Sequence, residues 1–369
     1  MNLRLFFIST ALFFIVIISE YIAYTAFNNS GIIRSGKLDA ILMILGVVFP
    51  LLFLISMMYS YKHYTLFNSW INSISSVWLA GVSYIFLVAL FVFVLILSNN
   101  QLALNIPIRS ISNILVVGVL VLVIYGVWHS SNPKITRYEI TSNALSPNWS
   151  GKKIVLISDT HLGDIRRERF MRRVVDLIKS ENPDITFNVG DFIDGPSIPY
   201  KKWLAPWATL NPELGNHYIE GNHEQYSKEY EFFKTQLPET INNLTNKKTI
   251  IKDTQIIGLS YIEKETGDEI KSRLKLLEHD PNLPSIILIH NPKNVRALSE
   301  SGVSLILSGH THGGQFFPLT IVVNKLYKEY SHGVAYTNNT PSITSYGVGT
   351  SIIPNRIGTH PEIIVITIK

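Results

Sequence analysis

The segment IVLISDTHLG (154–163) joins an apolar run of strand length to a turn that carries Asp159 and His161. A short apolar run bounded by turn residues is typical of a buried β-strand. Loops at the carboxyl ends of such strands are where layered α/β proteins place their ligands. The segment therefore predicts a strand that delivers one carboxylate and one imidazole to a functional site.

Four further fragments follow the same pattern, in order along the chain. They are ITFNVGDFIDG (185–195), YIEGNHEQ (218–225), SIILIHNP (285–292) and LILSGHTHGGQ (305–315). Most are an apolar run that ends in a residue type able to bind a metal, and the candidates are Asp191, Asn222, His223, His290, His310 and His312. A lone D-x-H or G-D after a strand is usually an ordinary loop. All five fragments together indicate one site.

The side chains in these fragments restrict the chemistry of that site. Carboxylate, imidazole and amide donors suit Mn, Fe, Zn or Co. The chain contains no cysteine, which excludes disulfides and thiolate metal sites. Apolar runs alternate with segments of helical periodicity, such as 166–180, and this favours a layered α/β or α+β sandwich.

The five fragments resemble the motifs of the calcineurin-like metallophosphoesterases, which read D-x-H, G-D, G-N-H-[DE], H and G-H-x-H. The resemblance covers residues 135–369. It is closest to a membrane-anchored branch with GHTHGGQ and a tail like GVGTSIIPNRIGTHPEI (347–363). It implies an α+β four-layer sandwich, in which two mixed β-sheets are flanked by helices.

The resemblance also implies two divalent metal ions (Mn, Fe, Zn or Co) and a role for each residue of the motifs. A hydroxide bridging the ions would attack phosphorus, and His223 would act as general acid on the leaving oxygen. The implied ligands are Asp159, His161 and His312 for one ion, Asn222, His290 and His310 for the other, and Asp191 as the bridge.

Other residues near the motifs are weaker candidates. Arg356 matches a family arginine near the site, and a substrate contact is its expected role. Asp164 and Asp194 follow motif loops, from which a carboxylate can orient a metal ligand. Tyr346 stands in SYGVG, where a small or basic residue is more usual, and it could reshape the rim of the pocket.

The first 130 residues lie outside the resemblance and have a different composition. Of 32 Lys and Arg and 27 Asp and Glu, they hold only Arg4, Glu20, Arg34, Lys37, Asp39, Lys62 and Arg109. Four segments, 5–27, 40–61, 71–98 and 111–130, have the ~20 predominantly apolar residues that a bilayer span needs. A buried helical core and a cleaved signal peptide are the alternatives. The long charge-free stretches favour spans, and the first run is too long for a signal peptide.

The sequence thus predicts a four-helix transmembrane domain over 1–130, a linker with a first strand over 131–151 and a metallophosphoesterase domain over 152–369. Four spans put both ends on one side of the membrane. The basic residues near the span ends slightly favour a cytoplasmic catalytic domain on a multi-pass protein of a bacterial inner membrane. Acidic and basic residues nearly balance after residue 130, so the charge indicates no nucleic-acid partner.

The expected function is hydrolysis of phosphodiester or pyrophosphate bonds in a phosphate-ester substrate. The tether makes a lipid-linked substrate attractive. The alternative is a membrane sensor or envelope protein that uses the phosphoesterase domain as a binding module. The complete ligand set argues against that alternative, because a binding module need not retain His223.

Overall fold

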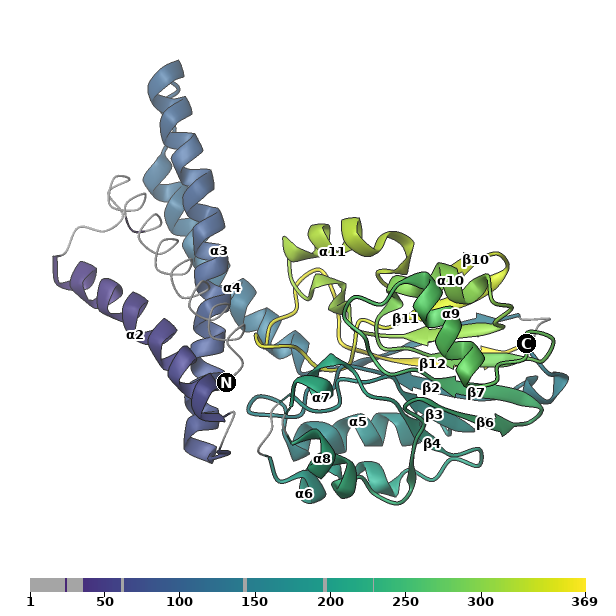
Figure 1. Ribbon diagram of the computed structural model, residues 1–369. Helices are drawn as coiled ribbons and strands as arrows, with labels where there is room; N and C mark the ends of the chain where they lie inside the picture. The colour runs from purple at the N-terminus through teal and green to yellow at the C-terminus, as the bar shows by residue number, and fades with distance from the viewer. Residues whose placement is uncertain (1–23, 25–35, 61–62, 142–144, 195–197, 228) are drawn as a thin grey trace. The chain divides into compact units, whose positions relative to one another are not determined.

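The computed structural model describes all residues except 1–23, 25–35, 61–62, 142–144, 195–197 and 228 (Figure 1). The chain divides into two compact units. One comprises Met1–Trp128 with Ile352–Asn355, and the other comprises His129–Ser351 with Arg356–Lys369. We call the first the helical unit and the second, after the function expected from the sequence, the catalytic unit.

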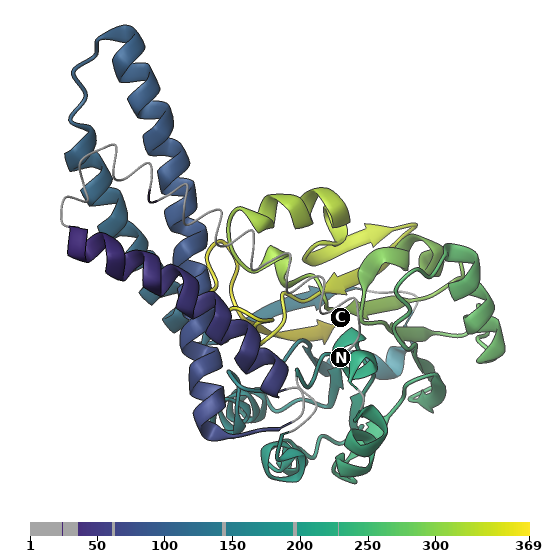
Figure 2. The same ribbon diagram turned by 60° about the vertical axis from the view of Figure 1, so that its left-hand side comes forward.

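The described part of the helical unit contains α2 (Gly36–Ser60), α3 (Leu66–Leu102) and α4 (Ile108–Ser130). The rings of Phe49 and Trp78 stack between α2 and α3 with centroids 4.7 Å apart. Ala89 and Val92 of α3 are fully buried in a cluster that includes Leu115 of α4. The helices α3 and α4 run side by side (Figure 2). Apolar side chains on both of them are exposed.

Two described helices, α3 and α4, are long and apolar enough to cross a membrane, rather than the four expected. The apolar part of α2, Ile44–Ser60, is shorter than a span. The segment 5–27 lies outside the described residues except for Tyr24. The expectation of a four-helix transmembrane domain is therefore not confirmed.

The catalytic unit contains two mixed six-stranded sheets, as expected. The first sheet has, from edge to edge, the strands β1 (Lys134–Ile140), β12 (Glu362–Ile368), β2 (Lys153–Ile157), β3 (Ile185–Asn188), β4 (Asn216–Tyr218) and β5 (Ile241–Asn243). The second has β10 (Gly333–Thr337), β11 (Thr340–Thr344), β9 (Leu305–Ser308), β8 (Ser285–Leu288), β7 (Thr254–Gly258) and β6 (Lys247–Ile251). The strands β2, β3 and β4 are parallel, as are β8 and β9.

Alternate residues of these strands form one core that includes Leu156, Phe187, Leu288, Leu307 and Ile366. This alternation is the period of two that a β-strand imposes on its side chains. The core draws on both sheets, so their inner faces pack together.

Helices cover the outer faces (Figure 1). They are α5 (Glu168–Ser180), α6 (Tyr200–Leu204) and α8 (Tyr230–Gln236) beside the first sheet, and α9 (Gly267–Leu276), α10 (Val295–Ser299) and α11 (Leu319–Tyr327) beside the second. The helix α5 buries Met171, Val174, Val175 and Ile178, the stripe that its sequence period predicts. Sheets and helices thus form the expected layers.

The strand β1 belongs to the first sheet, because it pairs in parallel with β12 from Lys134↔Glu362 to Ile140↔Ile368. Only Ser131, Asn132 and Pro133 separate it from the end of α4. The segment 131–151, expected as a linker with a first strand, is thus mostly integrated into the catalytic unit.

A buried carboxylate anchors the start of β12. Glu362 is fully buried and accepts hydrogen bonds from Thr136 Oγ1 at 2.6 Å and Tyr346 N at 2.9 Å. Its oxygens also lie 3.2 Å from His332 Nε2 and 3.5 Å from His360 Nε2. Burial alone would raise the pKa of Glu362, but the contacts with His332, His360 and Thr136 hold it well below its usual range.

We expect Glu362→Gln to destabilise the catalytic unit by about 3 kcal/mol, because hydrogen bonds to a buried charge are worth ~1.5–3 kcal/mol each. A group with a lowered folded pKa stabilises above its unfolded pKa of ~4.3, so the difference from native should shrink as pH falls below that value. Hydrogen exchange of the β12 amides, followed as a function of pH, would measure this loss of stability. Glu139→Gln, in the same sheet but paired with Lys369 at the surface, is the control and should have little effect. Equal effects of the two substitutions would contradict this account.

Candidate metal centre

Every candidate ligand lies at or just beyond the carboxyl end of a strand. Asp159 and His161 follow β2, Asp191 follows β3, and Asn222 opens the short helix α7 (Asn222–Tyr226) after β4. His290 follows β8, and His310 and His312 follow β9. The candidate ligands from both sheets thus lie at one edge, where the carboxyl ends of these strands meet. The structure brings together all seven residues predicted as ligands, and His223 with them.

Five of these residues have left-handed backbone conformations. Their φ angles are 53° at Asp159, 48° at His161, 52° at Asp191, 72° at His310 and 48° at His312. L-residues avoid this region at a cost of roughly 1–2 kcal/mol each. Strain of this kind collects at functional sites, where it persists because the surrounding structure enforces it. Here it turns the chain sharply as each strand ends, so that the side chain remains at the centre.

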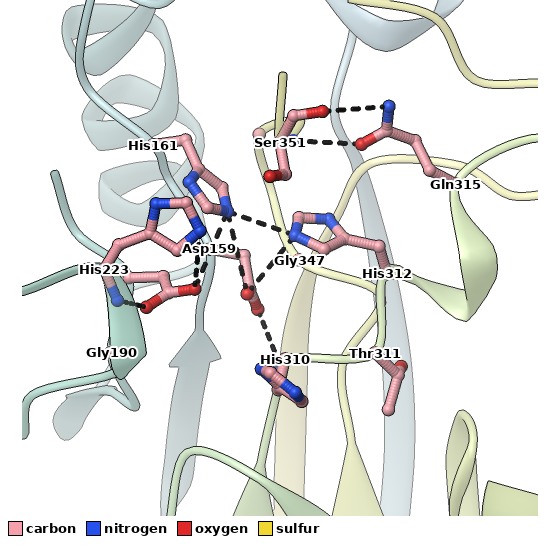
Figure 3. A network of polar contacts seen from close by, with 12 residues as sticks. Asp159, His161, Gly190, His223, His310, Thr311, His312, Gln315, Gly347 and Ser351 are labelled. Atoms are coloured by element: carbon pink, nitrogen blue, oxygen red, sulfur yellow. Dashed lines mark hydrogen bonds and ion pairs between the residues drawn. The ribbon is translucent and has the colours of Figure 1, made fainter. Parts of the chain in front are cut away.

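The first cluster consists of Asp159, His161 and His312 (Figure 3). The Nε2 atoms of the two histidines are 3.1 Å apart, and Oδ1 of Asp159 lies 3.4 Å from Nε2 of His312. This buried Oδ1 has no hydrogen-bond partner among the described residues. Three electron-pair donors therefore face one another.

The second cluster surrounds Nε2 of His290. The Oδ2 atom of Asp191 and the Oδ1 atom of Asn222 each lie 3.1 Å from it, and Nδ1 of His310 lies 3.2 Å from it. The Nδ1 atom of His290 donates to the Val189 carbonyl at 2.8 Å, so in the neutral ring Nε2 carries a lone pair. That lone pair would face other acceptors unless a cation lay between them.

Both clusters fit a metal ion. Two ligands ~2.1 Å from a tetrahedral ion lie roughly 3.4 Å apart, which is close to the observed separations. Asp191 connects the clusters, because its Oδ2 is 3.1 Å from Nε2 of His290 and 3.8 Å from Nε2 of His161. Burial lowers the pKa of His310 to about 3, which keeps that ring in the neutral form that binds metals. Burial opposes protonation of His290, but the Asp191 charge raises its pKa to about 9, so without an ion the ring holds a proton at Nε2 that a binding metal ion would displace.

His223 lies beside the clusters and is about one quarter exposed. Its Nδ1 lies 2.8 Å from Asp194 Oδ1, and its Nε2 lies 4.0 Å from Asp191 Oδ2. The same Asp194 oxygen contacts Nδ1 of His161 at 3.2 Å. Burial lowers the pKa of His223, but Asp191 and Asp194 outweigh it and raise the pKa to about 10. Asp194, which the sequence only suggested, therefore orients both rings.

Glu224, at the end of the G-N-H-E motif, was not singled out from the sequence. Its carboxylate accepts backbone N–H groups of Asp191, Phe192, Ile193 and Gly221 at 2.6–3.0 Å. It therefore holds the strained Asp191 loop against α7. The signal for it was present, since an acidic residue three positions after a helix N-cap typically bonds back to that cap.

Arg356 does not have the geometry expected of a substrate contact. Its side chain is fully buried. It donates to the carbonyls of Tyr346 and Gly349, each at 2.7 Å, and Nη2 lies 3.1 Å from Nδ1 of His312. Its donors are used inside the protein, where they connect the C-terminal tail to the His312 loop.

Part of the catalytic unit is similar to a known protein family. Residues 152–314 match the family model described as calcineurin-like phosphoesterase. This segment belongs to the calcineurin-like metallophosphoesterase family. A bovine transmembrane protein with a metallophosphoesterase domain is 30% identical over 261 residues, which cover 66% of this chain and 59% of that protein.

An uncharacterized metallophosphoesterase of Helicobacter pylori strain J99 is 32% identical over 241 residues, covering 63% of each protein. The chain thus spans about three fifths of the length of these two relatives. A solved dimetal phosphatase from Danio rerio is 13% identical with a TM-score of 0.35, covering 56% of this chain and 89% of that chain, and nothing is inferred from so low a score.

Proposed function

We propose that the chain is a two-metal phosphoesterase that hydrolyses phosphodiester or pyrophosphate bonds in a lipid-linked substrate at a membrane surface. The observation that carries the proposal is the pair of ligand clusters joined by Asp191, with the His223 ring, about one quarter exposed, beside them. A site that only bound a phosphate would need neither two cation clusters nor a partly exposed imidazole.

The proposed ligands are Asp159, His161 and His312 for one ion, Asn222, His290 and His310 for the other, and Asp191 for both. When bound, a pair of divalent ions lowers the pKa of a coordinated water and neutralises charge on a phosphate. Manganese, iron, zinc and cobalt all suit this donor set.

His223 is the proposed general acid. Asp194 holds its Nδ1 proton and so leaves Nε2 directed away from that carboxylate. Proton transfer from Nε2 to the leaving oxygen would let a poor leaving group depart as an alcohol or a phosphate. Asp194 also fixes the ring of His161 through Nδ1, as carboxylates commonly do for metal-bound histidines.

The membrane part of the proposal rests on α3 and α4 and on relatives named as transmembrane proteins with a metallophosphoesterase domain. In the proposed topology the protein crosses a bacterial inner membrane more than once, and the catalytic unit lies on the cytoplasmic side. The other candidate is a sensor that binds a phosphate ester without turning it over.

Metal-dependent turnover tests the proposal. The full chain in detergent is treated with a chelator, dialysed and supplied with Mn²⁺, and the hydrolysis of an aryl phosphodiester and of a nucleotide pyrophosphate is followed. We expect chelation to abolish hydrolysis of at least one substrate and Mn²⁺ to restore it. Binding of Mn²⁺ without turnover of either would favour the sensor, and turnover unaffected by chelation would refute the two-metal site.

A further inference from the structure

The helix α11 (Figures 1 and 2) presents an apolar face that is exposed among the described residues. Its sequence is LTIVVNKLY, and none of its residues is buried. Leu319, Val322 and Leu326, at spacings of three and four, are 46%, 59% and 70% exposed. The helix α5 of the same unit, by contrast, buries its apolar stripe. A contiguous patch of large apolar side chains on a surface helix is typical of an interaction site.

This helix is connected to the candidate metal centre. It follows the loop that carries His310 and His312, and Gly314 of that loop packs against the backbone of Leu319. At its other end the Tyr327 ring lies 6.3 Å from the His310 ring, centroid to centroid, and is nearly perpendicular to it. A partner bound on the exposed face would therefore lie next to the edge of the sheets that carries the candidate ligands.

The chain enters the catalytic unit at this same edge. Lys134, the first residue of β1, donates its backbone N–H to Pro361, and the next residue, Glu362, donates to Gly347. Gly347 lies against the Asp159 side chain. A short series of contacts thus connects the start of β1 to the candidate ligand Asp159.

The helix that precedes β1 indicates that the partner is a lipid bilayer. α4 is one of two helices among the described residues that are long and apolar enough to cross a membrane, and it ends at Ser130. Four Cα–Cα steps of at most ~3.6 Å separate Ser130 from Lys134, so the linker reaches no further than about 14 Å. A bilayer spanned by α4 would therefore end within about 14 Å of Lys134, the first residue of β1.

The residues around the apolar face suit lipid headgroups. Lys325 and Lys328 are exposed beside it, and Tyr327 and Tyr330 are partly buried near its end. Basic and aromatic residues that flank an apolar face are typical of helices lying in the membrane interface.

We propose that α11 is an interfacial helix that inserts its Leu319, Val322 and Leu326 side chains into the lipid bilayer. It would hold the metal centre at the level of the headgroups, where a phosphate ester carried by a membrane lipid can enter. The substrate part of this inference rests on the proposed phosphoesterase function, whereas the docking part does not.

The chain has no cysteine, so single labels can be placed without background. The full-length variants Val322→Cys and Leu326→Cys are labelled with an environment-sensitive fluorophore and placed in nanodiscs of equal parts phosphatidylcholine and phosphatidylglycerol. Leu276→Cys is the matched control, since Leu276 is 81% exposed at the end of α9. Quenching by lipids with a nitroxide on the acyl chain is compared with quenching by aqueous iodide.

We expect nitroxide lipids to quench the two α11 labels severalfold more than the Leu276 label, with the reverse order for iodide. Labels on α11 as open to iodide as the control would overturn the proposal. Shielding of the α11 labels from both quenchers would also overturn the proposal. Shielding that does not depend on protein concentration would show that another part of the chain covers the face. Shielding that increases with protein concentration would show that a second copy covers it.

Turnover separates this inference from the proposed function. We expect Val322→Glu with Leu326→Glu to lower, by an order of magnitude or more, the ratio between hydrolysis of a nanodisc lipid with an aryl phosphodiester headgroup and hydrolysis of a soluble aryl phosphodiester. Leu276→Glu should leave that ratio unchanged. Labels inserted without any hydrolysis would refute the phosphoesterase but not the docking, and an unchanged ratio with active enzyme would refute the lipid substrate.

Discussion

Asp191→Asn should give a protein with less than one metal ion per chain and almost no turnover. The carboxylate reaches both clusters, at 3.1 Å from Nε2 of His290 and 3.8 Å from Nε2 of His161. The amide keeps the shape but loses the negative charge that holds two cations close together. Metal ions supply several kcal/mol of transition-state stabilisation, so the loss in rate should be about 10³-fold or more.

Elemental analysis of the purified variant measures the metal content, and an aryl phosphodiester measures the rate. Asp176→Asn is the matched control, because Asp176 is exposed on α5, outside both clusters. That variant should keep both its metal and its rate. Two retained ions with full activity in Asp191→Asn would refute the bridging role.

His223→Ala should have a large effect of another kind. The ring belongs to neither the Asp159 nor the His290 cluster, so metal content should stay native. The rate on a phosphodiester with a poor leaving group should fall by ~10²–10⁴-fold, the usual worth of general acid catalysis. The loss should be much smaller for a good leaving group, which departs without a proton.

The difference can be measured with a series of aryl phosphodiesters whose leaving groups have graded pKa values. The rate of His223→Ala should depend more steeply on leaving-group pKa than the rate of the native protein. His279→Ala provides the control, since His279 precedes β8 and its Nε2 contacts Ser285 rather than the centre. An equal loss along the whole series, or a loss of metal, would show that His223 is not the acid.

Much of the catalytic unit was predictable because each ligand follows a run of apolar residues. Ile154–Ile157 and Leu305–Leu307 could be assigned to buried strands by composition alone, and parallel strands bring their carboxyl ends to one edge. The family resemblance then supplied the two mixed sheets, and the structure confirms them. The roles of the individual site residues remain predictions.

Other features depend on contacts between distant residues and left no local pattern. The hydrogen bonds of Arg356 go to carbonyls whose positions only the folded loops define. The segment Thr320–Val323 consists of four consecutive β-branched residues, which favour a strand, yet it lies within α11. Tertiary context overrides propensity there. Of the four expected spans, the described residues contain two helices long and apolar enough to cross a membrane, and the first expected span, 5–27, lies outside the described residues except for Tyr24.

The two clusters have a consequence for the stability of the fold. Each takes ligands from both sheets, and His161 and His312 in the first are 151 positions apart in the chain. This protein has no cysteine with which to close so long a loop. Ions bound there would do so instead, and closing a loop of this length by a cross-link is worth about 5 kcal/mol on a chain-entropy model. The supply of metal would then set how much of the protein stays folded as well as how fast it works.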